Sequence, residues 1–201
     1  MCSSDLGESS MLMYRKDLAD KAGVQLGDKP TWAQVKDLAA KIHDPKNGVY
    51  GICLRGKPGW GDNMAFLSTL VNTFGGQWFD MSWKPQLESK PWKDAISFYV
   101  DLLKNYGPPG SSANSFNEIL ALTNAGKCGM WIDATIAASF VSDPKQSKVA
   151  DQMAFAQAPT EHAEGRQLAV VVESGDSGRL EEGDRKSTRL NSSHGYISYA
   201  V

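Results

Sequence analysis

The sequence predicts an α/β fold in which helices cover both faces of a sheet, a layered helix-sheet-helix architecture. Short apolar segments alternate along the chain with amphipathic segments of helical length, an order typical of layered α/β domains. The short segments are apolar at consecutive positions, as strands are when helices cover both of their faces. The 201 residues, of which 41% are hydrophobic and 22% charged, suit one globular domain or one lobe of a larger protein.

Apolar runs indicate the strands, and apolar residues that recur every three or four positions indicate the helices. We find no internal repeat. The expected elements, in chain order, are a strand with a helix start at 10–18, a helix at 31–44, a strand at 49–54, a helix at 63–76, a hairpin or irregular excursion at 77–89, a helix at 91–107, a loop at 108–115, a helix at 116–126, a strand at 127–133, a short helix at 134–142 and a strand at 151–159.

The helices carry start and stop signals as well as the right period. Thr31 and Gln34 have the spacing of a capping box, and so do Ser115 and Glu118. Gly107, followed by two prolines, ends the most regular helix. The residues expected on the buried faces of the three longer helices are Trp32, Val35, Leu38, Ala39 and Ile42; Phe66, Leu67, Leu70, Val71 and Phe74; and Trp92, Ala95, Ile96, Tyr99, Leu102 and Leu103.

Charge and cysteine spacing exclude several classes of function. The net charge of −2 argues against a general nucleic-acid binder, which usually carries a basic face. No apolar run approaches the roughly 18 residues of a membrane helix, and the start of the chain lacks the basic and apolar regions of a signal peptide. The three cysteines and three histidines have no metal-ligand spacing, so we expect no metal site and no cofactor.

Four segments together resemble one family: YRKDLADKAG, TWAQVKDLAAKI, GWGDNMAFLSTLVNTFGG and AGKCGMWIDAT. Their order, spacing and loop residues are similar to the extracellular solute-binding proteins of sugar-type ABC importers, and more narrowly to the sorbitol/mannitol (polyol)-binding members. The resemblance covers residues 7–161. It implies a periplasmic-binding-protein type II fold, of which this chain holds mainly the second, C-terminal lobe.

The resemblance also implies a function that is not enzymatic. Two lobes would close by hinge motion over a sugar alcohol or related sugar, and the closed form would deliver it to the ABC permease subunits in the membrane. We expect a monomer in the periplasm, or outside the cell in association with the membrane, that binds no nucleic acid.

Both ends of the chain depart from the family pattern. The family has a Trp-rich segment after AFAQAPTE, whereas this chain reads HAEGRQLAVVVESGDSGRLEEG. One permitted choice of codons from Ala163 on, read one nucleotide later, encodes PKGANWLWSWNLAIPAASKK, which supplies that segment. We therefore interpret 162–183 as frameshifted. We interpret 1–6 and 184–201 as translated sequencing adapter, because their residues are a direct translation of DNA that resembles a common adapter. The alternative is a genuine low-complexity terminus.

The candidate ligand-binding residues lie in three places. Glu8 and Ser9 precede the first strand, at a step that in the family lies at the crossover between lobes and reaches the ligand; the alternative for Glu8 is a solvated loop acid. The loop RGKPGWGDN follows the strand at 49–54, where ligands sit in α/β sheets. Its glycines and proline would present Trp60 to stack on the apolar face of a polyol, unless Trp60 packs against the next helix.

Polar residues of the same loop and of the next strand complete the prediction. Arg55, Asp62 and Asn63 would hydrogen-bond to hydroxyl groups. Trp131 and Asp133 alternate on one strand and share a face, and Asp133 would accept hydrogen bonds from two neighbouring hydroxyls. The competing interpretation is that Asp133 caps the following helix near Thr135. Trp32 and Trp92, by contrast, lie on periodic helix faces and are expected in the core.

Cys53 and Cys128 both lie on predicted strands. In a periplasmic compartment they would form a disulfide if the strands are neighbours, and two buried free thiols are the alternative.

Two other classes of function compete with ligand binding. An α/β glycoside hydrolase would use a pair of carboxylates, for which Glu8 and Asp133 are the candidates, but the chain has no G-x-S-x-G motif and no P-loop. The other class is a structural or interaction module without a small ligand.

Overall fold

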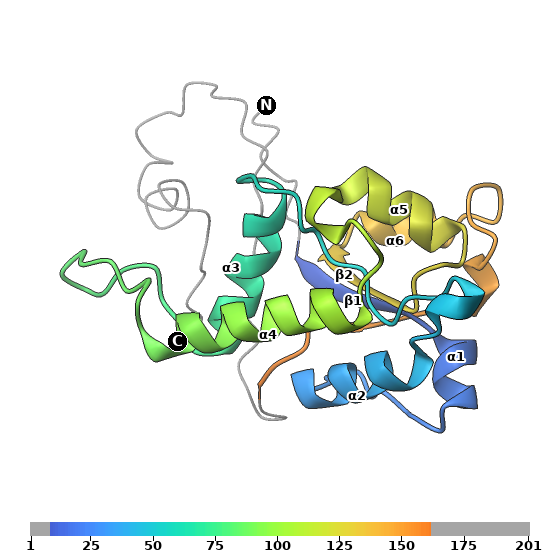
Figure 1. Cartoon of the computed structure of the whole chain (residues 1–201), viewed down its shortest axis with the longest axis horizontal. Coiled ribbons are helices and arrows are strands. Elements are labelled where there is room, and N and C mark those ends of the chain that lie inside the picture. Colours follow the sequence, from blue (N-terminus) through green and yellow to red (C-terminus); the bar gives the residue numbers. More distant parts are fainter. Residues whose placement is uncertain (1–8, 162–201) are drawn as a thin grey trace, which may run out of the picture.

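The structure, a computed structural model, describes residues 9–161 (Figure 1). Within this part of the chain no helix has the length and apolar character needed to span a membrane. The elements are β1 (Ser10–Arg15), α1 (Lys16–Lys21), α2 (Trp32–Ile42), η1 (Pro45–Asn47), α3 (Asn63–Thr73), α4 (Lys90–Tyr106), η2 (Ser111–Ala113), α5 (Phe116–Asn124), β2 (Met130–Ala134), α6 (Ala137–Val141), η3 (Ala150–Gln152) and β3 (Met153–Gln157).

The three strands of the described residues form one antiparallel sheet in the order β2-β1-β3, so the first of them, β1, lies in the middle. Leu12 lies opposite Ile132 on one side and Ala156 on the other, and Met13 lies opposite Trp131. Because successive side chains point to opposite faces of a sheet, Leu12 and Met13 belong to different packing layers.

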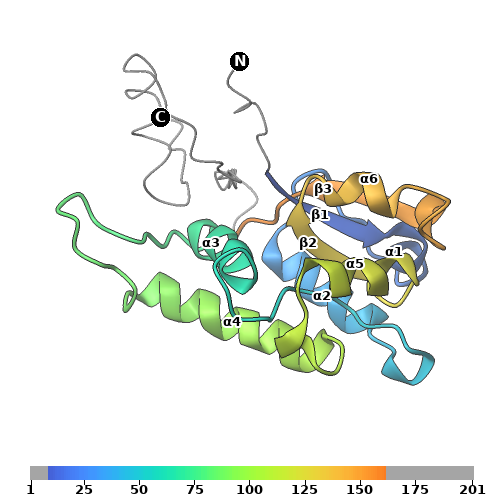
Figure 2. The same ribbon diagram turned by 90° about the horizontal axis from the view of Figure 1, so that it is seen from above.

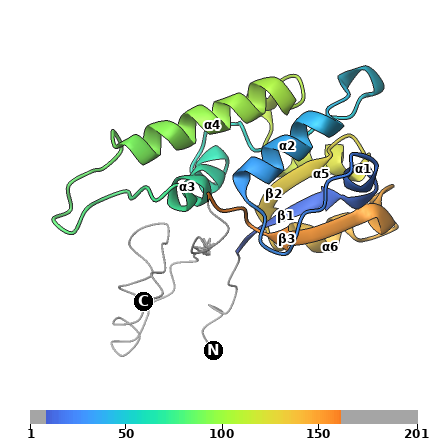
Figure 3. The ribbon, with the colours of Figure 1, turned by 90° about the horizontal axis from the view of Figure 1, so that it is seen from below.

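Each face of the sheet has its own hydrophobic core, which confirms the expected helix-sheet-helix layers. Figure 1 shows the sheet between α5 with α6 on one side and α1 with α2 on the other, and Figures 2 and 3 show the same elements from above and below. The first core joins helices α1 to α4 to the strand residues Leu12, Met130, Ile132 and Ala156. The second joins α5 and α6 to Met13, Trp131, Cys53 and Cys128.

The helices follow the sequence prediction closely. Both capping boxes form, and the Glu118 carboxylate accepts a hydrogen bond from the backbone N–H of Ser115 at 2.9 Å. The five predicted core positions of α2 are all buried, and both tryptophans assigned to the core, Trp32 and Trp92, are at most 4% exposed. Ile96 was expected on the buried face of α4 but is 41% exposed, because the helix packs through a narrower stripe around Ala95.

The segment 49–54 is not the strand that its apolar run predicted. Among the described residues it pairs with the chain around β2 only through two isolated parallel bridges, Tyr50 with Cys128, just before β2, and Cys53 with Trp131, within β2. Between the bridges, the backbone N–H of Ile52 donates to the carbonyl of Tyr106 at the end of α4, at 3.2 Å, instead of to a strand. The run is apolar because it is buried between layers, and not because it continues the sheet.

The excursion between α3 and α4 is irregular, as expected, and projects from the layered body (Figures 1 and 3). An antiparallel bridge joins Phe79 to Pro85. The Asp80 carboxylate closes the turn by accepting hydrogen bonds from the backbone N–H groups of Ser82 and Lys84, at 2.8 and 3.0 Å.

Candidate functional site

A largely buried ion pair joins the loop at 55–63 to the end of strand β2. The Arg55 guanidinium donates to both oxygens of Asp133, with Nε 2.7 Å from Oδ2 and Nη2 2.5 Å from Oδ1. Only 13% of the Arg55 side chain and 4% of the Asp133 side chain are exposed. The structure therefore brings together two residues that the sequence placed in a loop and at the end of a strand, in the planar two-bond geometry that suits arginine and carboxylate.

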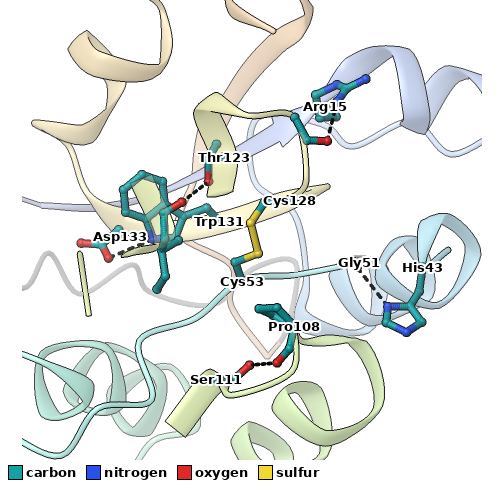
Figure 4. Close-up of a disulfide and its surroundings, with 12 residues drawn as sticks. Arg15, His43, Gly51, Cys53, Pro108, Ser111, Thr123, Cys128, Trp131 and Asp133 are labelled. Atoms are coloured by element: carbon teal, nitrogen blue, oxygen red, sulfur yellow. Dashed lines mark hydrogen bonds between the residues drawn. A yellow bond between two sulfur atoms is a disulfide. The ribbon is translucent and has the colours of Figure 1, made fainter. Parts of the chain in front are cut away.

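The hydrogen bonds of Asp133 occupy all of its acceptor positions. Oδ1 also accepts from the backbone N–H of Ala134 at 2.7 Å, and Oδ2 accepts from the indole N–H of Trp131 at 3.0 Å (Figure 4). A carboxylate has about four lone-pair positions, so nothing is left for a ligand hydroxyl unless a protein donor leaves. Asp133 does not cap α6 near Thr135, because the N–H of Thr135 donates to the carbonyl of Ser9 at 2.9 Å.

Arg55, by contrast, retains unused donors. Besides its two bonds to Asp133, its Nη1 donates to the carbonyl of Gly61, and its guanidinium lies 5.2 Å from the ring centre of Phe116. A guanidinium has five N–H groups, of which these three bonds use three. Toward the described residues the other two N–H groups make no hydrogen bond, so Arg55 is able to donate to a ligand while it stays paired with Asp133.

The loop at 55–63 is fixed at several points and presents one aromatic side chain. The Ser115 hydroxyl, at the start of α5, donates to the Asp62 carboxylate. Within the loop, the N–H of Gly59 donates to Asn63 Oδ1 at 3.2 Å. Trp60 is 68% exposed, so it is not a plug packed against the next helix. Arg55, Asp62 and Asn63 thus hold the loop, while Trp60 offers a free aromatic face.

The remaining predicted residues fall into two groups. Trp131 is fully buried, and its ring lies 5.2 Å from that of Phe116, so both of its faces are covered. Ser9 is partly buried and lies next to the end of β2 through its bond with Thr135. Glu8, like the segments interpreted as frameshifted or adapter-derived, lies outside the described residues.

Tyr99 is a contributor that the sequence did not reveal. Its hydroxyl, from helix α4, donates to the backbone carbonyl of Arg55 at 2.6 Å. Burial raises the pKa of Tyr99 to about 12, although a hydrogen bond with the Asn63 side chain acts in the opposite direction. The available signal was that a buried tyrosine hydroxyl needs a partner, but the helix period identifies only the apolar part of the residue.

The structure joins Cys53 and Cys128 in a disulfide, with the two Cα atoms 5.8 Å apart (Figure 4). Both cysteines are buried in the second core, beside Trp131. Residues 9–161 contain no group of three or more His, Cys, Asp or Glu side chains that would hold a metal ion.

Comparison with known proteins places this geometry in context. A family model described as bacterial extracellular solute-binding protein matches residues 5–177. The chain is 55% identical over 154 residues to a mannitol-binding protein of Pseudomonas aeruginosa, a match that covers 77% of this chain and 35% of that protein. The chain thus spans about a third of the length of this curated relative.

Two solved structures are similar in fold and sequence. One is an ABC transporter solute-binding protein from Agrobacterium vitis S4 with bound D-mannitol, at 61% identity and a TM-score of 0.75, covering 77% of this chain and 37% of that one. The other, from Agrobacterium radiobacter K84 in complex with ribitol, is 25% identical with a TM-score of 0.74, covering 83% and 41%.

Proposed function

Because the chain belongs to the bacterial extracellular solute-binding protein family, we propose that it is part of a protein that binds a sugar alcohol for an ABC importer. The observation that carries the proposal is the 61% identity to a protein whose structure holds D-mannitol. Mannitol or its epimer sorbitol is the proposed ligand, bound between this lobe and a second one. The closed protein would act in the periplasm as a monomer and deliver the ligand to the membrane permease subunits. As the family consists of binding proteins, we propose no enzymatic activity.

The geometry of the site supports a separate proposed role for each residue. Arg55 donates its two unused N–H groups to ligand hydroxyls, and Asp133 orients Arg55 rather than accepting from the ligand. Trp60 covers the C–H face of the polyol, because its ring is exposed at the tip of a fixed loop. Trp131 supports Asp133 from within the core.

Ser9 and Glu8 remain part of the proposed site on different grounds. Ser9 lies beside the end of β2, where Asp133 is located. Glu8 is the preceding residue of the chain, and its carboxylate would accept the hydroxyl hydrogens that Asp133 has no free position to accept. Asp62 and Asn63 contribute by holding the loop that carries Trp60.

A glycoside hydrolase mechanism finds no support in this arrangement. Such an enzyme needs one carboxylate as a nucleophile or base. Asp133 is the described member of the predicted pair, and its oxygens already accept bonds from Arg55, Trp131 and Ala134. A carboxylate held in this way is poorly placed to attack a substrate or to accept a proton from water.

Titration calorimetry tests the function directly. The full-length protein that carries residues 9–161 is expected to bind D-mannitol or D-sorbitol, whereas residues 9–161 alone are expected to bind neither tightly, because the second lobe is missing. Failure of the full-length protein to bind either polyol would overturn the proposed function. Micromolar binding by the isolated segment would instead overturn the division of the site between two lobes.

We also propose that the reading frame shifts between about Thr160 and Ala163, so that 162–183 replace a Trp-rich segment and 184–201, like 1–6, derive from adapter DNA. The family model nevertheless matches as far as residue 177. Sequencing the coding DNA decides between a frameshift and a genuine C-terminal segment. Codons that do not yield PKGANWLWSWNLAIP in the next reading frame exclude the frameshift.

A further inference from the structure

The main chain that carries Arg55 lacks the usual support of a strand. The segment 49–54 pairs with β2 itself at one isolated bridge, which places the N–H of Cys53 2.8 Å from the carbonyl of Met130. Beyond Cys53 the chain leaves the sheet, and the N–H of Gly56 donates to the carbonyl of Asn114 in a loop. A continuous ladder of backbone hydrogen bonds therefore does not fix the position of Arg55.

Two other anchors act on this short stretch from opposite sides. The disulfide ties Cys53 to Cys128, just before β2, on the side of the second core. Tyr99 reaches from α4, in the first core, and donates to the Arg55 carbonyl at 2.6 Å. Leu54, between the two anchored residues, is 1% exposed. The stretch 53–55 is thus fastened to both layers of the protein within three residues.

We propose that Tyr99 and the Cys53–Cys128 disulfide are positioning residues for ligand binding: together they fix the main chain of Arg55 so that its guanidinium reaches Asp133 and keeps its unused N–H groups directed at the ligand. The inference rests on the proposed function for the role of Arg55. The physical reason is that hydrogen bonds to a small ligand require donors placed to within about 0.5 Å, which a loop without further support does not provide.

The structure separates the two anchors from direct ligand contact. Cys53 and Cys128 are at most 1% exposed and Tyr99 is 6% exposed. The Tyr99 hydroxyl already donates its hydrogen bond to the Arg55 carbonyl, so it has no proton left to donate to a ligand. Changes at these residues should therefore act on the ligand only through Arg55.

The test uses the full-length protein that carries this segment, with three variants: Tyr99→Phe, the double variant Cys53→Ser/Cys128→Ser, and Tyr106→Phe as the matched control. Tyr106 lies on the same helix, and its hydroxyl hydrogen-bonds to none of the described residues. Two quantities are measured for each variant: the affinity for D-mannitol by calorimetry, and the hydrogen-exchange rate of the Arg55 Nε–H group by NMR. Circular dichroism confirms that each variant is folded.

We expect Tyr99→Phe and the cysteine variant to speed exchange of the Arg55 Nε–H and to weaken D-mannitol binding by about tenfold, with no change in Tyr106→Phe. Unchanged exchange in folded Tyr99→Phe would overturn the positioning role. Faster exchange with unchanged affinity would overturn its connection to the ligand. If the unsubstituted protein binds no polyol, the proposed function fails, while the exchange rates still report on how Arg55 is held.

Discussion

Arg55 and Asp133 share two hydrogen bonds across a sequence separation of 78 residues, and Asp133 accepts its other two from its own strand. The pair connects the loop that presents Trp60 to the sheet, so one interaction serves both stability and the proposed site.

Replacing Asp133 by Asn should destabilise the protein by about 3–5 kcal/mol, because it leaves the largely buried Arg55 charge, only 13% exposed, without its partner. Chemical denaturation of the full-length protein measures this loss. Asp37→Asn provides the control, because Asp37 pairs with Lys41 on an exposed helix face and should cost less than about 1 kcal/mol. Equal losses of unfolding free energy in the two variants would show that the Arg55–Asp133 pair stabilises the protein no more than an exposed ion pair does.

Replacing Trp60 by Ala should separate binding from stability. Because its ring is largely exposed, we expect the unfolding free energy to change by less than about 0.5 kcal/mol. The affinity for D-mannitol should fall by about tenfold, which corresponds to about 1.4 kcal/mol of lost stacking. Trp83→Ala, which removes a ring that is 65% exposed in the excursion after α3, should leave the affinity unchanged. A matching loss in both variants would argue against a specific contact by Trp60.

Tyr99 predicts a loss of stability at high pH. Its folded-state pKa of about 12 lies above the ordinary value of 10.0, so the protonated form is favoured in the native state. The resulting stability is complete below pH 10 and is lost as the pH rises toward 12. Denaturation of the unsubstituted protein across this range should show the fall, and Tyr99→Phe should be less stable at neutral pH but lose less above pH 10. Parallel curves for the two proteins would contradict this assignment.

Gly51 predicts a steric limit on the packing of the segment 49–54. A Cβ atom at this position would lie 2.3 Å from the carbonyl oxygen of Ala39 in α2, so Gly51→Ala must push the segment away from the helix. We expect a loss of about 1–3 kcal/mol in thermal or chemical unfolding. At Gly27 a Cβ would meet nothing within 4 Å, and Gly27→Ala should change stability by less than about 1 kcal/mol. Comparable effects at both glycines would show that contact with Ala39 is not limiting.

The sequence predicted the helices and the layers well because their signals are local. The capping box of Thr31 and Gln34 and the apolar period after it depend only on neighbours in the chain, and α2 forms as expected. The segment 49–54 shows the limit of such signals. An apolar run indicates burial, but whether its N–H groups reach a strand or the end of a helix depends on tertiary contacts, such as that of Ile52 with Tyr106.

The sequence predicted which types of residue form the candidate site, but not which of them bind a ligand and which hold the others in place. Composition and loop position suggested Arg55, Trp60 and Asp133 as polar and aromatic ligand contacts. The structure shows that Asp133 has its acceptor positions filled by donors from Arg55, Trp131 and Ala134. Whether the acceptor positions of Asp133 are filled depends on which donors the fold brings near it. The sequence does not indicate that Arg55 is one of them. Tyr99 was missed for the same reason.

The central place of β1 has a consequence for how the chain folds during synthesis. This strand is synthesised before both of its partners, which are among the last described elements: Ser10 pairs with Ala134, and Met11 pairs with Gln157. A sheet built from pairs so distant in sequence forms slowly, since a long loop must close before either pair is made. Until then the apolar faces of β1 are uncovered, so nascent chains that stop before Met153 should depend on chaperones to avoid aggregation.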